Sequence, residues 1–434
     1  MTRRKSTLAC AALALTLCAM SLTACGQKVG STGDEADPNA LTYWSSWSEG
    51  EPQQKIFADA IADFEKESGI NVDVRWLGRE ASTNINNANA VGDGPDLYDS
   101  GTDSLPDFRS KDGVSNVDDL LDETIPGDEV KVSDVLPPSV IAASSDESGL
   151  GLIPYTMIST AMWFNAAAHP EWVDAPPATF DDFLASAQKI KADGAVPIAQ
   201  DGSINFYNAY WFYWLQMRHG GPGSLSALGG SAEAWDDPSV LAAARDIERL
   251  ADAQLFQDAF LGTKFPEAQN AWAQGKYTFN LNGTWLASEV APNLAGGVTP
   301  QTFVFPAVDG GSDTVEIGAL GWTVNNKAKN PDAAKDFILF ALQKKYIERI
   351  STQALNISAR SDIDAPAPLT SLQQKLISAK TVNKTYDAAP GQYAGWWSDV
   401  FLPLDDKLLS GEISAEQFVT QGKTQTASYI AAAK

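Results

Sequence analysis

The fold of this chain is decided by residues 41–76, which read LTYWSSWSEGEPQQKIFADAIADFEKESGINVDVRW. A β-type run at 41–44 is followed by Pro52, a residue favoured in the first turn of a helix because it needs no amide hydrogen there. Apolar side chains then recur at helical spacing, at Phe57, Ala60, Ile61 and Phe64. Gly69 is expected to end this helix, and the alternating run at 71–76 is a second strand. Strand, helix and strand in succession predict a parallel sheet.

The same alternation of strands and helices continues along the chain. The turn that begins at Gly92 precedes an expected strand at 96–99, and Thr179 is expected to cap a helix that ends before a strand at 196–199. Residues 369–433 are mainly helical in pattern. The sequence therefore predicts an α/β fold with mostly parallel strands.

Composition limits both the size of the core and the class of partner. The chain has 434 residues, 44% of them hydrophobic and 10% aromatic, which is enough for about two globular units and argues against disorder. It carries 31 Lys and Arg against 55 Asp and Glu, a formal net charge of -24. Such a charge repels polyanions, so nucleic acid is not expected as a partner.

The N-terminus has the pattern of a secretory signal with a lipidation site. Arg3, Arg4 and Lys5 precede an uncharged apolar run, which predicts a cleaved signal peptide at 1–24. Its loss removes three positive charges and changes the net charge from -24 to -27. Cys25 follows Leu-Thr-Ala in a pattern that resembles the lipobox of bacterial lipoproteins, so we expect a diacylglyceryl group on its thiol.

Residues 25–39 form the expected lipidated cysteine and flexible tether, because they are rich in Gly, Ser, Thr, Asp and Pro. No later stretch is long and apolar enough to span a bilayer, so the lipid is the only membrane attachment expected. The folded part is expected outside the cytoplasmic membrane, on the surface of a Gram-positive bacterium rather than in a periplasm.

Several short motifs occur in a characteristic order along the expected mature chain. They are Tyr43-Trp44-Ser45-Ser46-Trp47, Gly94-Pro95-Asp96, Ile153-Pro154-Tyr155, Met162-Trp163-Phe164-Asn165, Gly275-Lys276, Asn282-Gly283-Thr284-Trp285, Gly321-Trp322 and Trp396-Trp397. Their order and spacing, together with the lipobox, resemble the extracellular solute-binding lipoproteins of carbohydrate ABC importers, of the maltose-binding type.

The resemblance implies a two-lobed periplasmic-binding-protein fold of type II, in which the lobes close about a hinge over a central ligand cleft. By analogy, residues 40–158 and 318–358 form lobe 1, and residues 159–317 and 359–434 form lobe 2. The implied function is capture of a neutral oligosaccharide and its delivery to the transmembrane subunits of an ABC permease. A monomer without enzymatic activity, cofactor or metal is implied as well.

A sugar site needs flat aromatic rings for the apolar faces of the sugar and fixed polar groups for its hydroxyls. The expected loops supply both, and the resemblance supports the aromatic positions Trp285 and Trp396 and the carboxylate of Asp103. The candidate ligand-binding residues are Ser46, Trp47, Glu49, Arg79, Asp99, Asp103, Tyr155, Tyr207, Trp285, Trp322, Trp396 and Trp397. Tyr207 belongs to the stretch 205–211, which is rich in polar and aromatic residues.

Structural roles compete with these assignments. There are 13 Trp residues, and tryptophan is usually highly buried. Core positions are expected for Trp44, Trp76, Trp163, Trp172, Trp214, Trp235 and Trp272. Glu49 equally fits a helix start, Asp99 equally fits a cap, and Arg79 equally fits an ion pair with a surface acid.

The first loop departs from the maltose-binding pattern, because Ser48 and Glu49 stand where the family example has Asp and Lys. The sugar is therefore not specified. The number of aromatic candidates favours more than one sugar ring, such as a xylo-oligosaccharide or an α-glucoside.

Two alternatives from other classes remain open. A secreted lipoprotein glycoside hydrolase needs only a pair of suitably spaced carboxylates, which an acid-rich chain offers in abundance. Serine hydrolase chemistry is disfavoured because the chain has no Gly-x-Ser-x-Gly motif, and a histidine-based site is disfavoured because only His169 and His219 are present. The second alternative keeps the binding fold but gives it a ligand other than a sugar.

Overall fold

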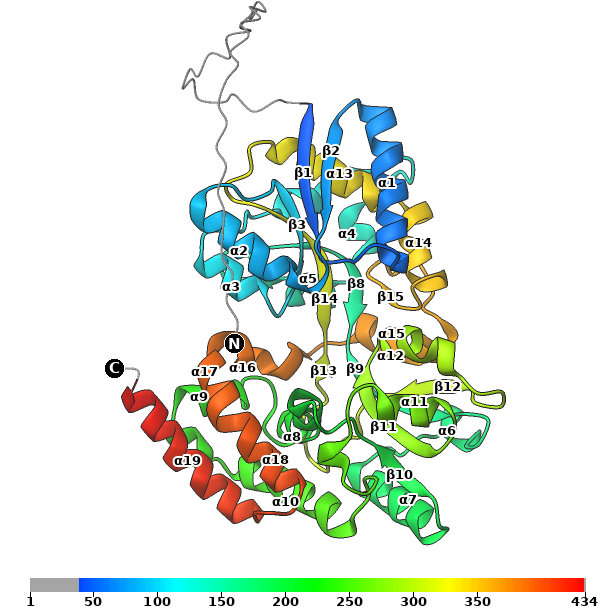
Figure 1. Ribbon diagram of the computed structural model, residues 1–434, viewed down its shortest axis with the longest axis vertical. Helices are drawn as coiled ribbons and strands as arrows, with labels where there is room; N and C mark the ends of the chain where they lie inside the picture. Colours follow the sequence, from blue (N-terminus) through cyan, green and yellow to red (C-terminus); the bar gives the residue numbers. More distant parts are fainter. Residues whose placement is uncertain (1–38, 433–434) are drawn as a thin grey trace, which may run out of the picture. The chain divides into compact units, whose positions relative to one another are not determined.

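The computed structural model describes residues 39–432, which contain two main β-sheets flanked by helices (Figure 1). The first sheet has the strand order β15-β8-β14-β3-β1-β2. Its strands are β1 (Ala40–Ser45), β2 (Asn71–Trp76), β3 (Leu97–Gly101), β8 (Ile153–Ile158), β14 (Gly318–Val324) and β15 (Ile357–Ser358). Strand β1 is parallel to β2 and β3, whereas β14 is antiparallel to β3 and β8. This arrangement confirms the α/β class.

The strand–helix–strand unit predicted at 41–76 is confirmed. Helix α1 (Pro52–Ser68) begins at its proline, and its apolar face is buried. It ends at Gly69, whose φ of 75° lies in the left-handed region that glycine adopts without a steric penalty. The chain then returns as β2 in register with β1, pairing Leu41 with Val72. Helix α2 (Ala81–Val91) and then β3 follow.

The second sheet has four strands in the order β10-β11-β9-β12. They are β9 (Thr160–Asn165), β10 (Val196–Ala199), β11 (Tyr277–Gly283) and β12 (Pro300–Phe303). Its larger helices are α7 (Phe180–Ala192), α8 (Asn205–Gly220), α10 (Pro238–Ala253), α18 (Leu402–Leu409) and α19 (Ala415–Ala432). Thr179 caps α7 as predicted, because its hydroxyl accepts a hydrogen bond from the Asp182 amide at 3.1 Å.

Shorter elements connect these parts. The remaining α-helices are α3 (Leu105–Ser110), α4 (Val132–Val135), α5 (Pro138–Ala143), α6 (Glu171–Asp174), α9 (Ser226–Gly230), α11 (Glu267–Ala273), α12 (Leu286–Val290), α13 (Pro331–Ala341), α14 (Lys344–Thr352), α15 (Thr370–Ser378), α16 (Ala389–Gln392) and α17 (Ala394–Trp396). Two-stranded pairs are β4 (Thr124–Ile125) with β5 (Val130–Lys131), β6 (Ser145–Asp146) with β7 (Gly149–Leu150), and β13 (Val315–Glu316) with β16 (Val382–Asn383). Within 39–432, no helix has the length and apolar character needed to cross a bilayer.

The chain passes from the first main sheet to the second through a single residue, Ser159, which separates β8 from β9. Ile317 alone separates β14 of the first sheet from β13, which pairs with β16 outside both main sheets. The carboxylate of Glu316 is buried at this point, where it accepts hydrogen bonds from the hydroxyls of Thr160 at 2.6 Å and Thr385 at 3.0 Å. These bonds join three segments that are distant in the sequence. The lobe boundaries at 158/159, 317/318 and 358/359 stay a prediction.

Candidate ligand cleft

A cavity of about 770 Å³ lies where the ends of several strands of the first sheet meet a segment of the second. Ser46 follows β1 and Arg79 follows β2, while Asp99 belongs to β3. The opposite side is formed by Trp285, Ser288 and Glu289, which follow β11 of the second sheet. Ligands of open α/β sheets bind beyond the carboxyl ends of parallel strands, and β1, β2 and β3 provide such an edge.

Asp99 is the most constrained polar group of this cavity. Its Oδ1 accepts a hydrogen bond from the Tyr43 hydroxyl at 2.7 Å, and its Oδ2 accepts from the Ser45 hydroxyl at 2.5 Å and the Ser46 amide at 2.9 Å. Burial raises the pKa of Asp99 to about 6, although these hydrogen bonds act in the opposite direction. The carboxylate is thus held in a fixed orientation rather than capping a helix.

The first loop is organised by two interactions. The Trp47 indole donates its Nε1 hydrogen to the Tyr155 hydroxyl at 3.1 Å, which fixes the ring. The Arg79 guanidinium lies 5.5 Å from the Trp47 ring centroid and donates to the Ser46 carbonyl at 3.1 Å and to Glu51 Oε1 at 2.8 Å. The one cation among the cavity-lining residues is therefore paired with an acid of the same cavity.

On the side of the second sheet, Trp285 is seated against a glycine. A Cβ atom added at Gly283 would lie 2.3 Å from Cη2 and Cζ3 of the Trp285 ring, so only glycine permits this position of the indole. Glu289 lies one helical turn further on and accepts a hydrogen bond from the Gln269 amide nitrogen at 3.0 Å. Partial desolvation raises the pKa of Glu289.

Half of the candidate site residues line this cavity. They are Ser46, Trp47, Arg79, Asp99, Asp103 and Trp285. Tyr155 lies behind the lining, where it is fully buried and acts on the cavity through Trp47. Glu49 is exposed and does not line the cavity, because α1 begins three residues later and Glu51 occupies the position before the helix.

Four aromatic candidates do not line the cavity. Trp322 and Trp396 are 0% exposed, with their indole nitrogens bonded to the Tyr43 hydroxyl at 3.3 Å and to the Thr426 hydroxyl at 2.9 Å, so these two rings offer no face to a sugar. Trp397 and Tyr207 are 7% and 8% exposed. Burial raises the pKa of Tyr207 to about 12, and its hydroxyl interacts with Trp285 and Glu289 of the cavity wall. The roles of Trp397 and Tyr207 in sugar binding stay a prediction.

The tryptophans that were expected in the core differ in how deeply they are buried. Fully buried rings are those of Trp163, Trp214, Trp235 and Trp272, and Trp172 is 9% exposed. Trp44 and Trp76 are only partly buried, because β1 and β2 lie at one edge of the first sheet.

Other cavity-lining polar residues escaped the sequence analysis. They are Glu51, Gln53, Ser82, Ser100, Ser104, Thr156, Ser288, Glu289 and Asn356. The sequence could have identified Glu51, because it stands directly before the proline that begins a helix. It could also have identified Glu289, because this residue lies four residues after Trp285 and hence on the same side of a short helix. Thr156 lies in β8, which pairs with both β14 and β15, and Asn356 directly precedes β15.

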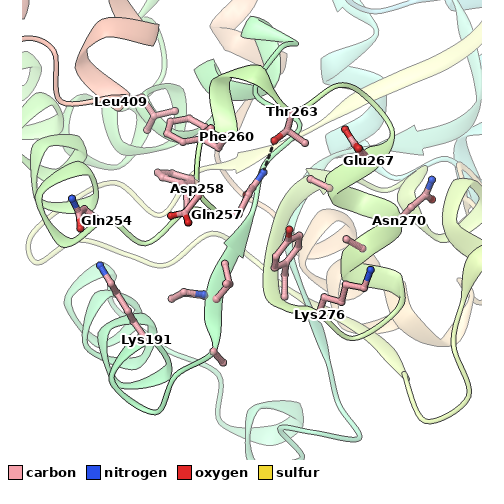
Figure 2. A pocket seen from close by; sticks show the side chains of 18 of the residues that line it. Lys191, Gln254, Gln257, Asp258, Phe260, Thr263, Glu267, Asn270, Lys276 and Leu409 are labelled. Carbon is pink, nitrogen blue, oxygen red and sulfur yellow. Dashed lines mark hydrogen bonds between the residues drawn. The ribbon is translucent and has the colours of Figure 1, made fainter.

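A larger cavity of about 1110 Å³ lies elsewhere, beside α7, α10 and α11 (Figure 2). Its labelled lining includes Lys191, Gln254 and Gln257, and Gln257 donates to the Thr263 hydroxyl at 3.2 Å. No strand of the first sheet contributes to it. The smaller cavity therefore remains the candidate ligand cleft, since it alone of the two joins residues of both sheets. No group of three His, Cys, Asp or Glu side chains in the described part of the chain is placed to hold a metal ion.

Two α/β units joined by short crossings around a polar and aromatic cleft define the class of two-lobed solute-binding proteins. Comparison with solved structures supports this fold. The bacterial solute receptor AcbH matches with a TM-score of 0.73 at 17% identity, covering 90% of this chain and 98% of that one. A cyclo/maltodextrin-binding protein complexed with maltotetraose matches with a TM-score of 0.70 at 16% identity, covering 92% and 98%.

Sequence comparison places the chain in a family. Residues 46–348 match the family model of the bacterial extracellular solute-binding proteins. The melibiose/raffinose/stachyose-binding protein MelE of Bacillus subtilis is 23% identical over 370 residues, covering 81% of this chain and 82% of MelE. The chain belongs to the family of bacterial extracellular solute-binding proteins. Its members are solute-binding proteins.

Proposed function

We propose that this protein captures a neutral oligosaccharide outside the cell and delivers it to an ABC permease. The observation that carries this proposal is a cleft with one tryptophan on each side, Trp47 from the first sheet's loop and Trp285 from the second sheet. Aromatic rings from two units can pack on the apolar faces of a sugar, and buried or oriented carboxylates can accept its hydroxyl hydrogens. Relatives named for melibiose, raffinose and stachyose, and for multiple sugars, support a carbohydrate ligand.

The charge of the cleft favours a neutral ligand. Four acids line it, and they are Glu51, Asp99, Asp103 and Glu289. Arg79 is the one cation of the lining, and Glu51 already pairs with it. An anionic ligand would therefore meet unfavourable electrostatics without an available cation.

Closure of the cleft follows from the positions of these groups. A sugar that contacts both Trp47 and Trp285 gains its full set of contacts only when the two sides approach each other. Its higher affinity for that form shifts the population toward closure. The permease then distinguishes the loaded protein from the free one by its closed form.

We assign the direct contacts to Ser46, Trp47, Arg79, Asp99, Asp103 and Trp285, and add Glu289 and Asn356. Tyr155 is a positioning residue for Trp47. The identity of the sugar stays a proposal at the level of its class, with α-galactosides, α-glucosides and xylo-oligosaccharides as the first series to test.

Lipid anchoring is part of the proposal. Cys25 lies outside the described residues, and its assignment depends on the Leu-Thr-Ala sequence before it. Mass spectrometry of the protein from an expressing bacterium should show a mass increase on the N-terminal peptide that is absent from Cys25→Ser. A Cys25 variant with unchanged membrane association and mass would contradict the anchor.

The decisive experiment is calorimetric titration of residues 26–434 with raffinose, stachyose, maltotetraose, xylotetraose and galactose. Amino acids and short peptides serve as non-sugar ligands. We expect one sugar series to bind without turnover, with a dissociation constant near the micromolar range, about -8 kcal/mol. Release of shorter sugars by the pure protein would establish a glycoside hydrolase instead. Binding of peptides or amino acids alone would keep the fold and refute the sugar.

A further inference from the structure

A third cavity lies beside Ser159, the connection between the two main sheets, and beside β13. It measures about 450 Å³ and is distinct from the ligand cleft. The segments that line it include Ser159 between β8 and β9, Thr314 and Val315 at β13, and Thr381 just before β16. Ser159 connects the two main sheets, and β13, which pairs with β16, leads through Ile317 into β14 of the first sheet. We call this space the hinge cavity.

The hinge cavity and the ligand cleft are lined by adjacent parts of the same chain segment. Thr156 and Ile158 line the ligand cleft, whereas Ser159 and Thr160 line the hinge cavity, so the division falls between residues 158 and 159. The two cavities share no lining residue.

The charge of the hinge cavity is opposite to that of the protein. Arg218, Lys375 and Lys380 line it against a single acid, Asp313. The whole chain carries -24, and the ligand cleft has four acids against one arginine. A local excess of cations in a strongly acidic protein focuses positive potential in this cavity.

The guanidinium of Arg218 is buried and forms no ion pair with the described residues; burial lowers its pKa, although the Asp313 carboxylate of the same cavity acts to raise it. Its guanidinium is satisfied by four backbone carbonyls, those of Phe305, Pro306, Ser312 and Thr314, at 2.6 to 3.1 Å. No acid among the described residues lies within ion-pair distance of it. The residue is 3% exposed, so solvent screens its charge poorly.

The two lysines complete the cation cluster and are available. Both are exposed, and neither forms an ion pair or a hydrogen bond through its ammonium group with any residue in 39–432. Lys375 extends from α15, and Lys380 lies between that helix and β16. Each ammonium therefore keeps three donors for an external acceptor.

We propose that the hinge cavity is a binding site for a small oxyanion with two or more negative charges, held by Lys375 and Lys380 above the buried charge of Arg218. The chemistry required is that of phosphate, pyrophosphate or a compact polycarboxylate, because charge-assisted hydrogen bonds to two ammonium groups are formed together. The site is independent of the sugar assigned to the ligand cleft.

The test is calorimetric titration of residues 26–434 with pyrophosphate in dilute, non-coordinating buffer. The wild-type protein should bind one pyrophosphate saturably, and the double variant Lys375→Gln, Lys380→Gln should bind it at least about tenfold more weakly. The matched control is Lys66→Gln with Lys264→Gln, which removes two exposed lysines outside the cavity and should leave the affinity unchanged. Equal weakening of pyrophosphate binding in both double variants would show that net charge alone causes the effect, and would overturn the site.

Three further results decide the proposal. Pyrophosphate should raise the unfolding temperature of the wild type but not of the double variant, as ligand linkage requires. Vesicles with and without phosphatidylglycerol distinguish a lipid phosphate from a free anion, since only the former would make binding depend on the vesicle. Unchanged affinity for the sugar in the double variant shows that the protein is folded. Absence of saturable pyrophosphate binding by the folded wild type would refute the site while leaving the proposed sugar function untouched.

Discussion

The Trp285 ring packs directly on Gly283, which permits a test in which the tryptophan is moved rather than removed. An added Cβ at Gly283 would lie 2.3 Å from two ring atoms, whereas carbon atoms in contact lie about 3.5 to 4 Å apart. The ring of Gly283→Ala must therefore shift by about 1 Å or more. The backbone at this position lies outside the left-handed region, so alanine itself introduces no strain there.

Trp285→Ala and Gly283→Ala should reduce the affinity for the sugar by different amounts. A central aromatic anchor contributes about 2 kcal/mol, so Trp285→Ala should weaken sugar binding about 30-fold. A displacement of about 1 Å forfeits roughly half of a dispersion contact. Gly283→Ala should then lose about 1 kcal/mol, a weakening of about fivefold.

Titration calorimetry measures the affinity of both variants for the sugar that the wild-type protein binds, and circular dichroism checks that the variants are folded. Gly296→Ala is the control, because a Cβ there meets nothing within 4 Å and its φ is not positive. Full affinity in Trp285→Ala would remove this ring from the site. A normal affinity in Gly283→Ala, with Trp285→Ala impaired, would refute the argument that the glycine places the ring.

Three other predictions concern side chains around the cleft and in the core. Tyr155→Phe removes the hydroxyl that accepts from Trp47 and should weaken sugar binding about fivefold, for a loss of about 1 kcal/mol; an unchanged affinity would show that the indole needs no partner. The raised pKa of Asp99, about 6 against a usual 3.8, means that its contribution to stability is complete below about pH 3.8 and is lost as the pH rises through 6. Asp99→Asn should therefore gain up to about 3 kcal/mol relative to wild type between pH 4 and 7 in urea unfolding, and a pH-independent difference would contradict the burial of this carboxyl. Asp405 is buried with neither side-chain oxygen bonded in the described structure, and burial raises its pKa well above the usual value. Asp405→Val should raise the free energy of unfolding by about 1 to 3 kcal/mol, whereas a lower unfolding midpoint in urea would show that the carboxyl has a stabilising partner.

Local sequence patterns were sufficient for most of the fold. The strand–helix–strand unit at 41–76 carries its own signals, namely the proline that begins α1, the four apolar positions on one face and the glycine that ends it. Gly92 likewise ends α2 with a φ of 77°, at the start of the turn expected there. Such signals depend on residues within about one helical turn of each other, which is why a single sequence reveals them.

The cleft was only partly predictable, because exposure depends on what covers a side chain. Asp99 was identified at the end of an expected strand and Arg79 just after another, and strand ends are defined locally. Trp396 has the same local appearance as Trp285, yet the helices around it leave its ring no exposed surface. The pairing of β15 with β8, which brings Asn356 to the cavity, leaves no trace in either segment alone.

The position of β14 has a consequence for how the chain is made. This strand pairs with both β3 and β8 in the middle of the first sheet, but it follows β3 by roughly 220 residues, a separation that takes about 10 to 40 s to synthesise at 5 to 20 residues per second. During that time β3 and β8 have no partner between them, and their unpaired backbone edges are exposed. The nascent protein must therefore remain incompletely folded until most of its length has been made, and that interval is when it is most exposed to aggregation and most dependent on chaperones.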